Sequence, residues 1–142
     1  MNADSASHGP WSMKSLQVHT NTDQPAVATV LLLDEDGQEF TATAEGDGPI
    51  AAALQAIEQV TGVIITLRNF ELHSASVGED AQGEVTVTVE HDGQDYRGRG
   101  TSVDIVEAGS HACLEVINRI LRRRLRGDSN EDAAARLDKA TI

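Results

Sequence analysis

The chain has 142 residues, a formal net charge of −12 and an aromatic content of only 3%. Its length fits one domain, or two half-sized units that share a core. The scarcity of Lys and Arg argues against binding to nucleic acid through a basic surface. The single cysteine, Cys113, excludes an internal disulfide and favours a cytoplasmic location, and no apolar run approaches the ~20 residues of a membrane-spanning helix.

The first elements predicted in chain order are three strands and a helix. Residues 1–12 precede them and are rich in small and polar residues, so we expect a flexible segment or a remnant added in cloning. Strands are predicted over residues 14–20, 27–33 and 39–44, with Asp36-Gly37 forming the turn between the last two. A helix is predicted to begin at Pro49 and to end at Gly62.

The same order of elements is predicted a second time. Strands are expected over residues 64–76, 85–90 and 94–99, and a helix of about 21 residues begins near Asp104. The tripeptide Asp36-Gly37-Gln38 recurs 56 residues later as Asp92-Gly93-Gln94. The sequence therefore predicts an α+β domain over residues 13–126 built from two βββα units (13–62 and 63–126), with antiparallel sheets covered on one side by two helices. Residues 127–142 are predicted to be a flexible tail.

No catalytic group of residues is predicted. Cys113 lies in the middle of the second helix, and His111, two residues away, does not share its face, so we expect a packing role for Cys113. The histidines lack the spacing of metal ligands, and no cofactor motif is present. We therefore expect neither metal nor cofactor, and a small independent enzyme is the least favoured alternative.

Two loops contain candidate binding residues. Gly46-Asp47-Gly48-Pro49-Ile50 opens the first helix, where unpaired backbone N–H groups favour a carboxylate or phosphate. The other loop, residues 74–81, has small residues that would let a ligand approach the backbone, and it carries Glu79 and Asp80. A plain turn is the alternative interpretation of this second loop.

Residues from about Leu16 to Leu121 resemble the C-terminal regulatory domain of 2-isopropylmalate synthase, which is shared with citramalate synthase. The resemblance rests on ordered motifs: Ser15-Leu16-Gln17-Val18, Gly46 to Ile50, Asn69-Phe70, Gly78 to Val85, Gly98-Arg99-Gly100, Asp104-Ile105 and the helix from Glu107 to Asn118. The resemblance implies a homodimer that binds leucine and thereby inhibits a catalytic acyltransferase barrel in the same or another chain. That barrel and its metal site do not match this sequence, so no catalytic residues are expected here.

The resemblance further implies which residues contact the ligand. They are Gly46, Gly48, Ile50, Ala51, Phe70, Ser74 and Ala81, and we add Asp47 and Asp80 as candidates. Small residues would form a slot for the branched side chain with Phe70 as its wall, helix N–H groups would bind the carboxylate, and Asp47 or Asp80 the ammonium. Asn69-Phe70 stands where the family usually has Asp-Tyr, and Ser74 where a small apolar residue is common. Isoleucine binding, as in citramalate synthase, and a ligand-free dimerisation or scaffold module remain alternatives.

Overall fold

The computed structural model describes residues 10–74 and 82–141. Its elements are β1 (Ser12–His19), β2 (Ala26–Leu33), β3 (Glu39–Gly46), α2 (Pro49–Thr61), β4 (Thr66–Ser74), β5 (Gly83–His91), β6 (Gln94–Ser102) and α3 (Ile105–Thr141). They form two three-stranded antiparallel sheets, ordered β1-β2-β3 and β4-β5-β6. The predicted duplication of a βββα unit is thereby confirmed.

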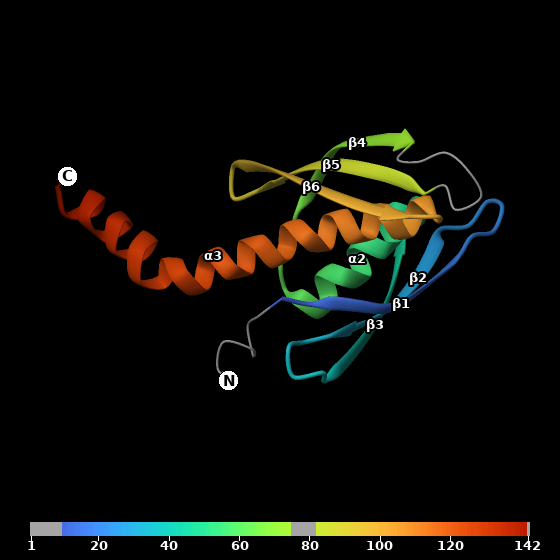
Figure 1. Cartoon of the computed structure of the whole chain (residues 1–142), viewed down its shortest axis with the longest axis horizontal. Helices are drawn as coiled ribbons and strands as arrows, with labels where there is room; N and C mark the ends of the chain where they lie inside the picture. Colours follow the sequence, from blue (N-terminus) through green and yellow to red (C-terminus); the bar gives the residue numbers. More distant parts are fainter. Residues whose placement is uncertain (1–9, 75–81, 142) are drawn as a thin grey trace.

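The two helices lie between the two sheets (Figure 1). Helix α2 packs on β2 and β3, α3 packs on β5 and β6, and the helices also contact each other. Each sheet is thus covered by helix on one face, as predicted. The inward side chains of β2 and β5 alternate with more exposed ones, as expected for sheets with one buried face.

The helices approach the sheets closely because small residues meet at the contacts. An added Cβ at Gly98 would lie 2.4 Å from the Ala112 carbonyl oxygen, and one at Gly100 would lie 2.2 Å from that of Ala108. On α2 the buried face consists largely of alanine. This explains how a chain with so few aromatic residues forms a dense core.

The two halves can be aligned residue by residue. A β-bulge separates Met13 from Ser15 in β1, and a bulge at the same place in β4 separates Leu67 from Asn69. The residues that follow the bulges therefore correspond, so that Leu16 is equivalent to Phe70. In the helices, Ala52 N–H donates to Gly48 O at 2.9 Å and Ala108 N–H donates to Asp104 O at 2.8 Å, which makes Gly48 equivalent to Asp104.

The two hairpin connections differ in length, and several elements begin or end at residues other than those predicted. The connection of the first hairpin, residues 34–38, is longer than that of the second, Asp92-Gly93. In the longer connection the Asp34 carboxylate accepts hydrogen bonds from the backbone N–H groups of Asp36 and Gln38, both at 2.9 Å. Strand β6 continues to Ser102. Helix α3, predicted to end near residue 126, continues to Thr141, since residues 131–140 include many strong helix formers such as Ala, Glu, Arg, Leu and Lys.

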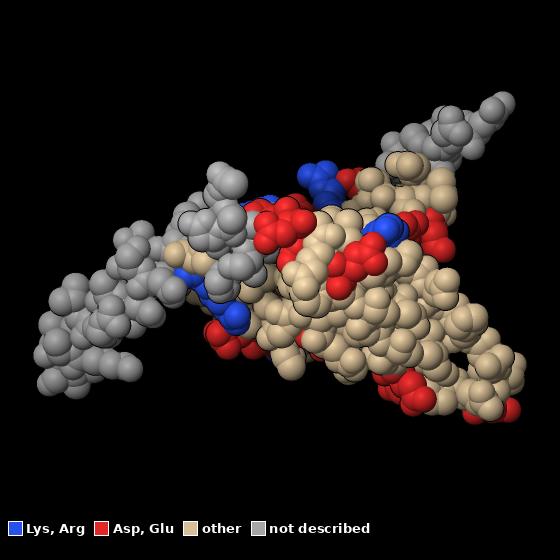
Figure 2. All heavy atoms as spheres, turned by 90° about the horizontal axis from the view of Figure 1, so that it is seen from below, with Lys and Arg blue, Asp and Glu red and all other residues tan. Residues whose placement is uncertain are grey.

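The outer face of β1–β3 contrasts with the rest of this acidic chain. Its central strand directs Val27, Leu31 and Leu33 outward, and these side chains are partly exposed. Figure 2, which views the molecule from the side of this sheet, shows a broad area without charged side chains. None of the described helices combines the length and apolar character needed to cross a bilayer.

Candidate functional site

The N-terminus of α2 has no side-chain cap. Gly48 is the N-cap residue with extended backbone angles (φ −154°, ψ 177°), Pro49 follows it, and the first turn contains no acidic residue. Among the described residues, the N–H groups of Ile50 and Ala51 therefore lack the carboxylate or hydroxyl partner that usually caps a helix. An external anionic group can interact favourably with this helix end.

The N-terminus of α3, at the equivalent place in the other half, is capped by its own residues. Asp104 Oδ1 accepts hydrogen bonds from Val106 N–H at 2.8 Å and from Glu107 N–H at 3.2 Å. Ser102 Oγ accepts from Asp104 N–H at 3.1 Å and donates to Glu107 Oε1 at 2.8 Å. The two helix starts thus share an equivalent backbone hydrogen bond but differ in capping, because Asp104 caps α3 and Gly48 has no side chain to cap α2.

Phe70, Ile50 and Gly109 meet beside the open end of α2. An added Cβ at Gly109 would lie 2.7 Å from Phe70 Cε2 and 3.0 Å from Ile50 Cδ1. The ring on β4 and the side chain on the first turn of α2 therefore both contact the backbone of α3 at this residue. The structure brings together Ile50 and Phe70, two of the predicted contact residues that are far apart in the sequence.

An apolar pocket continues from this point between α2 and the start of β4. Its volume is about 460 Å³, and it is lined by Ile50, Ala51, Leu54, Gln55, Glu58, Ile64, Ile65 and Leu67. Glu58 Oε2 accepts a hydrogen bond from Ile65 N–H at 3.0 Å. Burial raises the pKa of Glu58, and this hydrogen bond opposes the rise.

A second pocket lies between β1, the start of α2 and the start of α3. Its volume is about 340 Å³, and it is lined by Leu16, Val18, Thr20, Pro49, Asp104, Val106 and Glu107. Each of these residues has an equivalent in the opposite half of the domain. In the same order, the equivalents are Phe70, Leu72, Ser74, Ile105, Gly48, Ile50 and Ala51. Five of these seven were predicted from the sequence to contact a ligand.

The remaining predicted residues have varied surroundings. Gly46 ends β3, and an added Cβ there would lie 2.5 Å from the Ala52 nitrogen, so close packing of α2 requires this glycine. Asp47 is exposed in the connection to α2. Ser74 ends β4 and pairs with Gly83, whereas Asp80 and Ala81 lie outside the described residues.

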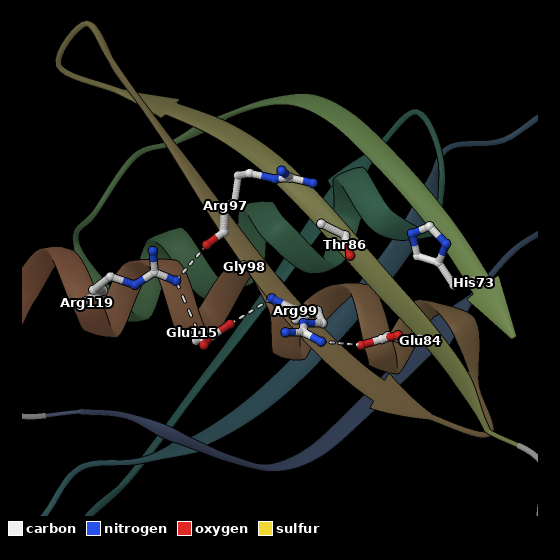
Figure 3. Close-up of a pocket in the computed structure, with 8 residues that line it drawn as sticks. All are labelled: His73, Glu84, Thr86, Arg97, Gly98, Arg99, Glu115 and Arg119. Atoms are coloured by element: carbon white, nitrogen blue, oxygen red, sulfur yellow. Dashed lines mark hydrogen bonds and ion pairs between the residues drawn. The ribbon is translucent and has the colours of Figure 1, made fainter. Parts of the chain in front are cut away.

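A polar groove of about 640 Å³ lies beside β6 (Figure 3). Arg99 Nη1 pairs with Glu84 Oε2 at 2.9 Å, and Arg99 N–H donates to Glu115 Oε1 at 2.7 Å. Arg119 Nη2 donates to the Arg97 carbonyl oxygen at 2.6 Å and lies 3.9 Å from Glu115 Oε2. These side chains of α3 cover the free backbone groups of an edge strand, which protects the sheet from pairing with other chains.

Cys113 is a buried packing residue, as predicted. Its exposed fraction is 1%, and burial, with a smaller effect of Glu58, raises the pKa of the thiol to about 12. Among the described residues, His, Cys, Asp and Glu side chains form no group of three or more suited to hold a metal ion.

Comparison with known proteins shows the family to which this chain belongs. A family model described as the LeuA allosteric (dimerisation) domain matches residues 2–121. The chain belongs to this family. It is 47% identical over 102 residues to the 2-isopropylmalate synthase of Xanthomonas campestris pv. campestris (strain B100) and 46% identical over 99 residues to that of Stenotrophomonas maltophilia (strain K279a). These matches cover 72% and 70% of this chain but 20% and 19% of the relatives, so the chain spans about a fifth of their length.

Membership of the LeuA allosteric domain family confirms the resemblance inferred from the sequence motifs. Two neighbours of the predicted contacts were missed. Gly109 was read only as part of a helix, and Leu72, whose exposed fraction is 52%, was not singled out. The internal duplication was the available signal, because Leu72 is equivalent to Val18 and Gly109 to Ala53.

Proposed function

We propose that this chain is the allosteric, dimer-forming part of a 2-isopropylmalate synthase and that it binds leucine at the open N-terminus of α2. The observation that supports leucine binding is the pairing of an uncapped helix start with an apolar wall formed by Ile50 and Phe70. An α-amino acid with a branched aliphatic side chain needs both features: N–H donors for its carboxylate and an apolar slot for its side chain.

Two acidic residues, Asp47 and Asp80, are candidates for binding the ammonium group. Asp47 is exposed and precedes the N-cap residue, and its carboxylate has no hydrogen-bond partner among the described residues. Asp80, from the loop outside the described residues, is the second candidate. A charge-assisted hydrogen bond from the ammonium to either carboxylate would fix the orientation of the amino acid.

Regulation would then follow from differential binding. Leucine can inhibit a catalytic acyltransferase part, in the same or another chain, only if it binds one arrangement of the two parts more tightly than another. The broad area without charged side chains on the outer face of β1–β3 and the family's description as a dimerisation domain support a homodimer as the unit in which this occurs.

Calorimetric titration of the 142-residue chain with leucine and with isoleucine tests the proposal. We expect a saturable heat with leucine and weaker binding of isoleucine, because a change in branch position costs roughly 1–3 kcal/mol in a fitted pocket. Tighter binding of isoleucine would favour the citramalate synthase type of effector site. No heat and no rise in melting temperature with either amino acid at millimolar concentration would favour a scaffold.

A variant at the N-cap makes the test specific to this site. Gly48→Asp gives α2 the same cap that Asp104 gives α3, so its carboxylate would occupy the N–H groups proposed for the ligand. We expect leucine affinity to fall at least tenfold while the fold is retained, since the extended angles of Gly48 suit any residue. The matched control is Asp104→Gly, which opens the other helix start and should leave leucine binding at α2 unchanged.

A further inference from the structure

The two halves of the domain differ in residue size at one equivalent contact between a helix and the first strand of its sheet. In the first half, Ala53 on α2 belongs to a cluster of buried alanines against which Leu16 and Val18 of β1 pack. In the second half, the position of Leu16 is taken by the larger Phe70, and the position of Ala53 by Gly109. A larger residue on the strand is thus matched by a smaller residue on the helix.

The contact in the second half leaves no room for a side chain on α3. A Cβ at residue 109 would lie 2.7 Å from Phe70 Cε2 and 3.3 Å from Phe70 Cζ, closer than ordinary van der Waals contact. It would also lie 3.0 Å from Ile50 Cδ1. The aromatic ring therefore rests against the helix backbone itself.

We propose that Gly109 is a positioning residue of the effector site: by lacking a side chain, it seats the Phe70 ring against α3 and so sets the apolar wall of the slot. This inference rests on the proposed function of the α2 N-terminus. It adds α3 to that site, since the wall is held by the helix of the second half while the N–H donors belong to the helix of the first.

The neighbouring contacts indicate which group would move if residue 109 were enlarged. The start of α2 is held against β3, because an added Cβ at Gly46 would lie 2.5 Å from the Ala52 nitrogen. The α2 backbone therefore has little freedom to retreat, and a methyl group at residue 109 displaces the Phe70 ring and the end of Ile50. Both displaced groups border the slot in which the leucine side chain is proposed to bind.

Three variants of the 142-residue chain test this role by calorimetric titration with leucine and by thermal unfolding. We expect Gly109→Ala to raise the Kd for leucine about tenfold or more. The double variant Phe70→Leu/Gly109→Ala recreates the pair Leu16 and Ala53 of the first half, so its melting temperature should recover towards the parent value. Its leucine Kd should stay raised at least tenfold, because the aromatic wall is gone.

The matched control is Ala53→Gly on α2. It loosens the equivalent contact of the first half and weakens a helix, so it should lower the melting temperature and leave the leucine Kd unchanged. A purely structural role of Gly109 would instead change stability alone, with an unchanged Kd in every folded variant.

The outcomes separate this inference from the function on which it rests. Gly109→Ala binding leucine with the parent Kd would overturn the role of Gly109 and leave the proposed function intact. If Gly109→Ala does not fold by circular dichroism, the double variant decides, and parent-like affinity there would overturn the inference. A parent chain that binds neither leucine nor isoleucine would overturn both.

Discussion

The side-chain amide of Asn118 forms two hydrogen bonds with the backbone of Trp11, 107 residues earlier in the chain. Trp11 N–H donates to Asn118 Oδ1 at 2.6 Å, and Asn118 Nδ2 donates to the Trp11 carbonyl oxygen at 2.9 Å. The Trp11 ring also meets Phe40 edge-on, with ring centres 5.2 Å apart. The segment entering β1 is therefore attached to α3, the same helix that carries Gly109.

Removing this clamp should release the start of β1. Asn118→Ala leaves a partly buried N–H and carbonyl group without partners, so we expect the free energy of unfolding to fall by about 1–3 kcal/mol. Trp11 is the only tryptophan, and its fluorescence emission should shift to longer wavelength as its surroundings become more hydrated. Asn118→Asp keeps the acceptor and loses the donor, so its effect should be intermediate. Unchanged emission and stability in Asn118→Ala would show that the clamp contributes nothing in solution.

Enlarging a glycine of β6 should separate α3 from its sheet. The Cβ of Gly100→Ala would lie 2.2 Å from the Ala108 carbonyl oxygen, a backbone atom that cannot rotate away. We expect a loss of about 1–3 kcal/mol or more of unfolding free energy, measured by denaturant titration. Thr101→Ala, at the exposed neighbouring position, is the control and should have a much smaller effect. Equal stabilities of the two variants would contradict the close contact.

The stability of the fold should depend on the charge of Glu58. Because burial raises the pKa of this carboxyl, folding favours its protonated form. The stability contributed by the protonated group is fully present below the ordinary pKa of 4.5 and is lost as the pH rises through the raised value. Glu58→Gln keeps an acceptor for Ile65 N–H and carries no charge.

We therefore expect Glu58→Gln to have a higher melting temperature than the parent at pH 8, with the difference disappearing near pH 4. Glu45→Gln removes the same charge at an exposed position and controls for the change in net charge. A Glu58→Gln variant that is less stable than the parent at pH 8 would mean that the hydrogen bond to Ile65 outweighs the cost of burial.

The Glu115 carboxylate at the edge of β6 should protect the backbone amide of Arg99 from hydrogen exchange. Glu115→Ala removes the acceptor of Arg99 N–H, so hydrogen exchange at the Arg99 amide should become several-fold faster. Glu115→Gln retains an oxygen acceptor and should preserve most of the protection. Exchange at Arg99 that is equally fast in the parent and in Glu115→Ala would show that this edge is open to solvent.

The parts of the fold that depend on local chemistry were predictable from the sequence. The alternation of valine and threonine in β5 gave its buried face, and Asp92-Gly93 gave a tight turn in which both residues have positive φ, 53° and 78°. The strand ends at the first hairpin, Leu33 and Glu39, were also predicted, but the hydrogen bonds to the Asp34 carboxylate within its turn were not. A dipeptide pattern does not reveal which side chain will cap the turn.

In the candidate site, too, the features set by neighbouring residues were predictable, and the contacts between distant segments were not. The open helix start at Gly48 follows from the neighbouring residues alone, since no Ser, Thr, Asp or Asn occupies the N-cap. The contact of Gly109 with Phe70 joins a helix to a strand 39 residues earlier in the chain, and only the packing of α3 against the second sheet brings the two together. Sequence motifs named both segments without indicating that they touch.

The glycine and alanine contacts between helices and strands determine which positions of this domain tolerate larger side chains. At these contacts the backbones of helix and strand lie close together, beside a core of valine, isoleucine and leucine side chains. Adding a methyl group at Gly46, Gly98 or Gly100 forces whole elements apart, whereas trimming a valine of β5 removes few atoms. A saturation-mutagenesis survey should therefore find these positions to be the least tolerant of growth, even though they contribute almost no hydrophobic surface of their own.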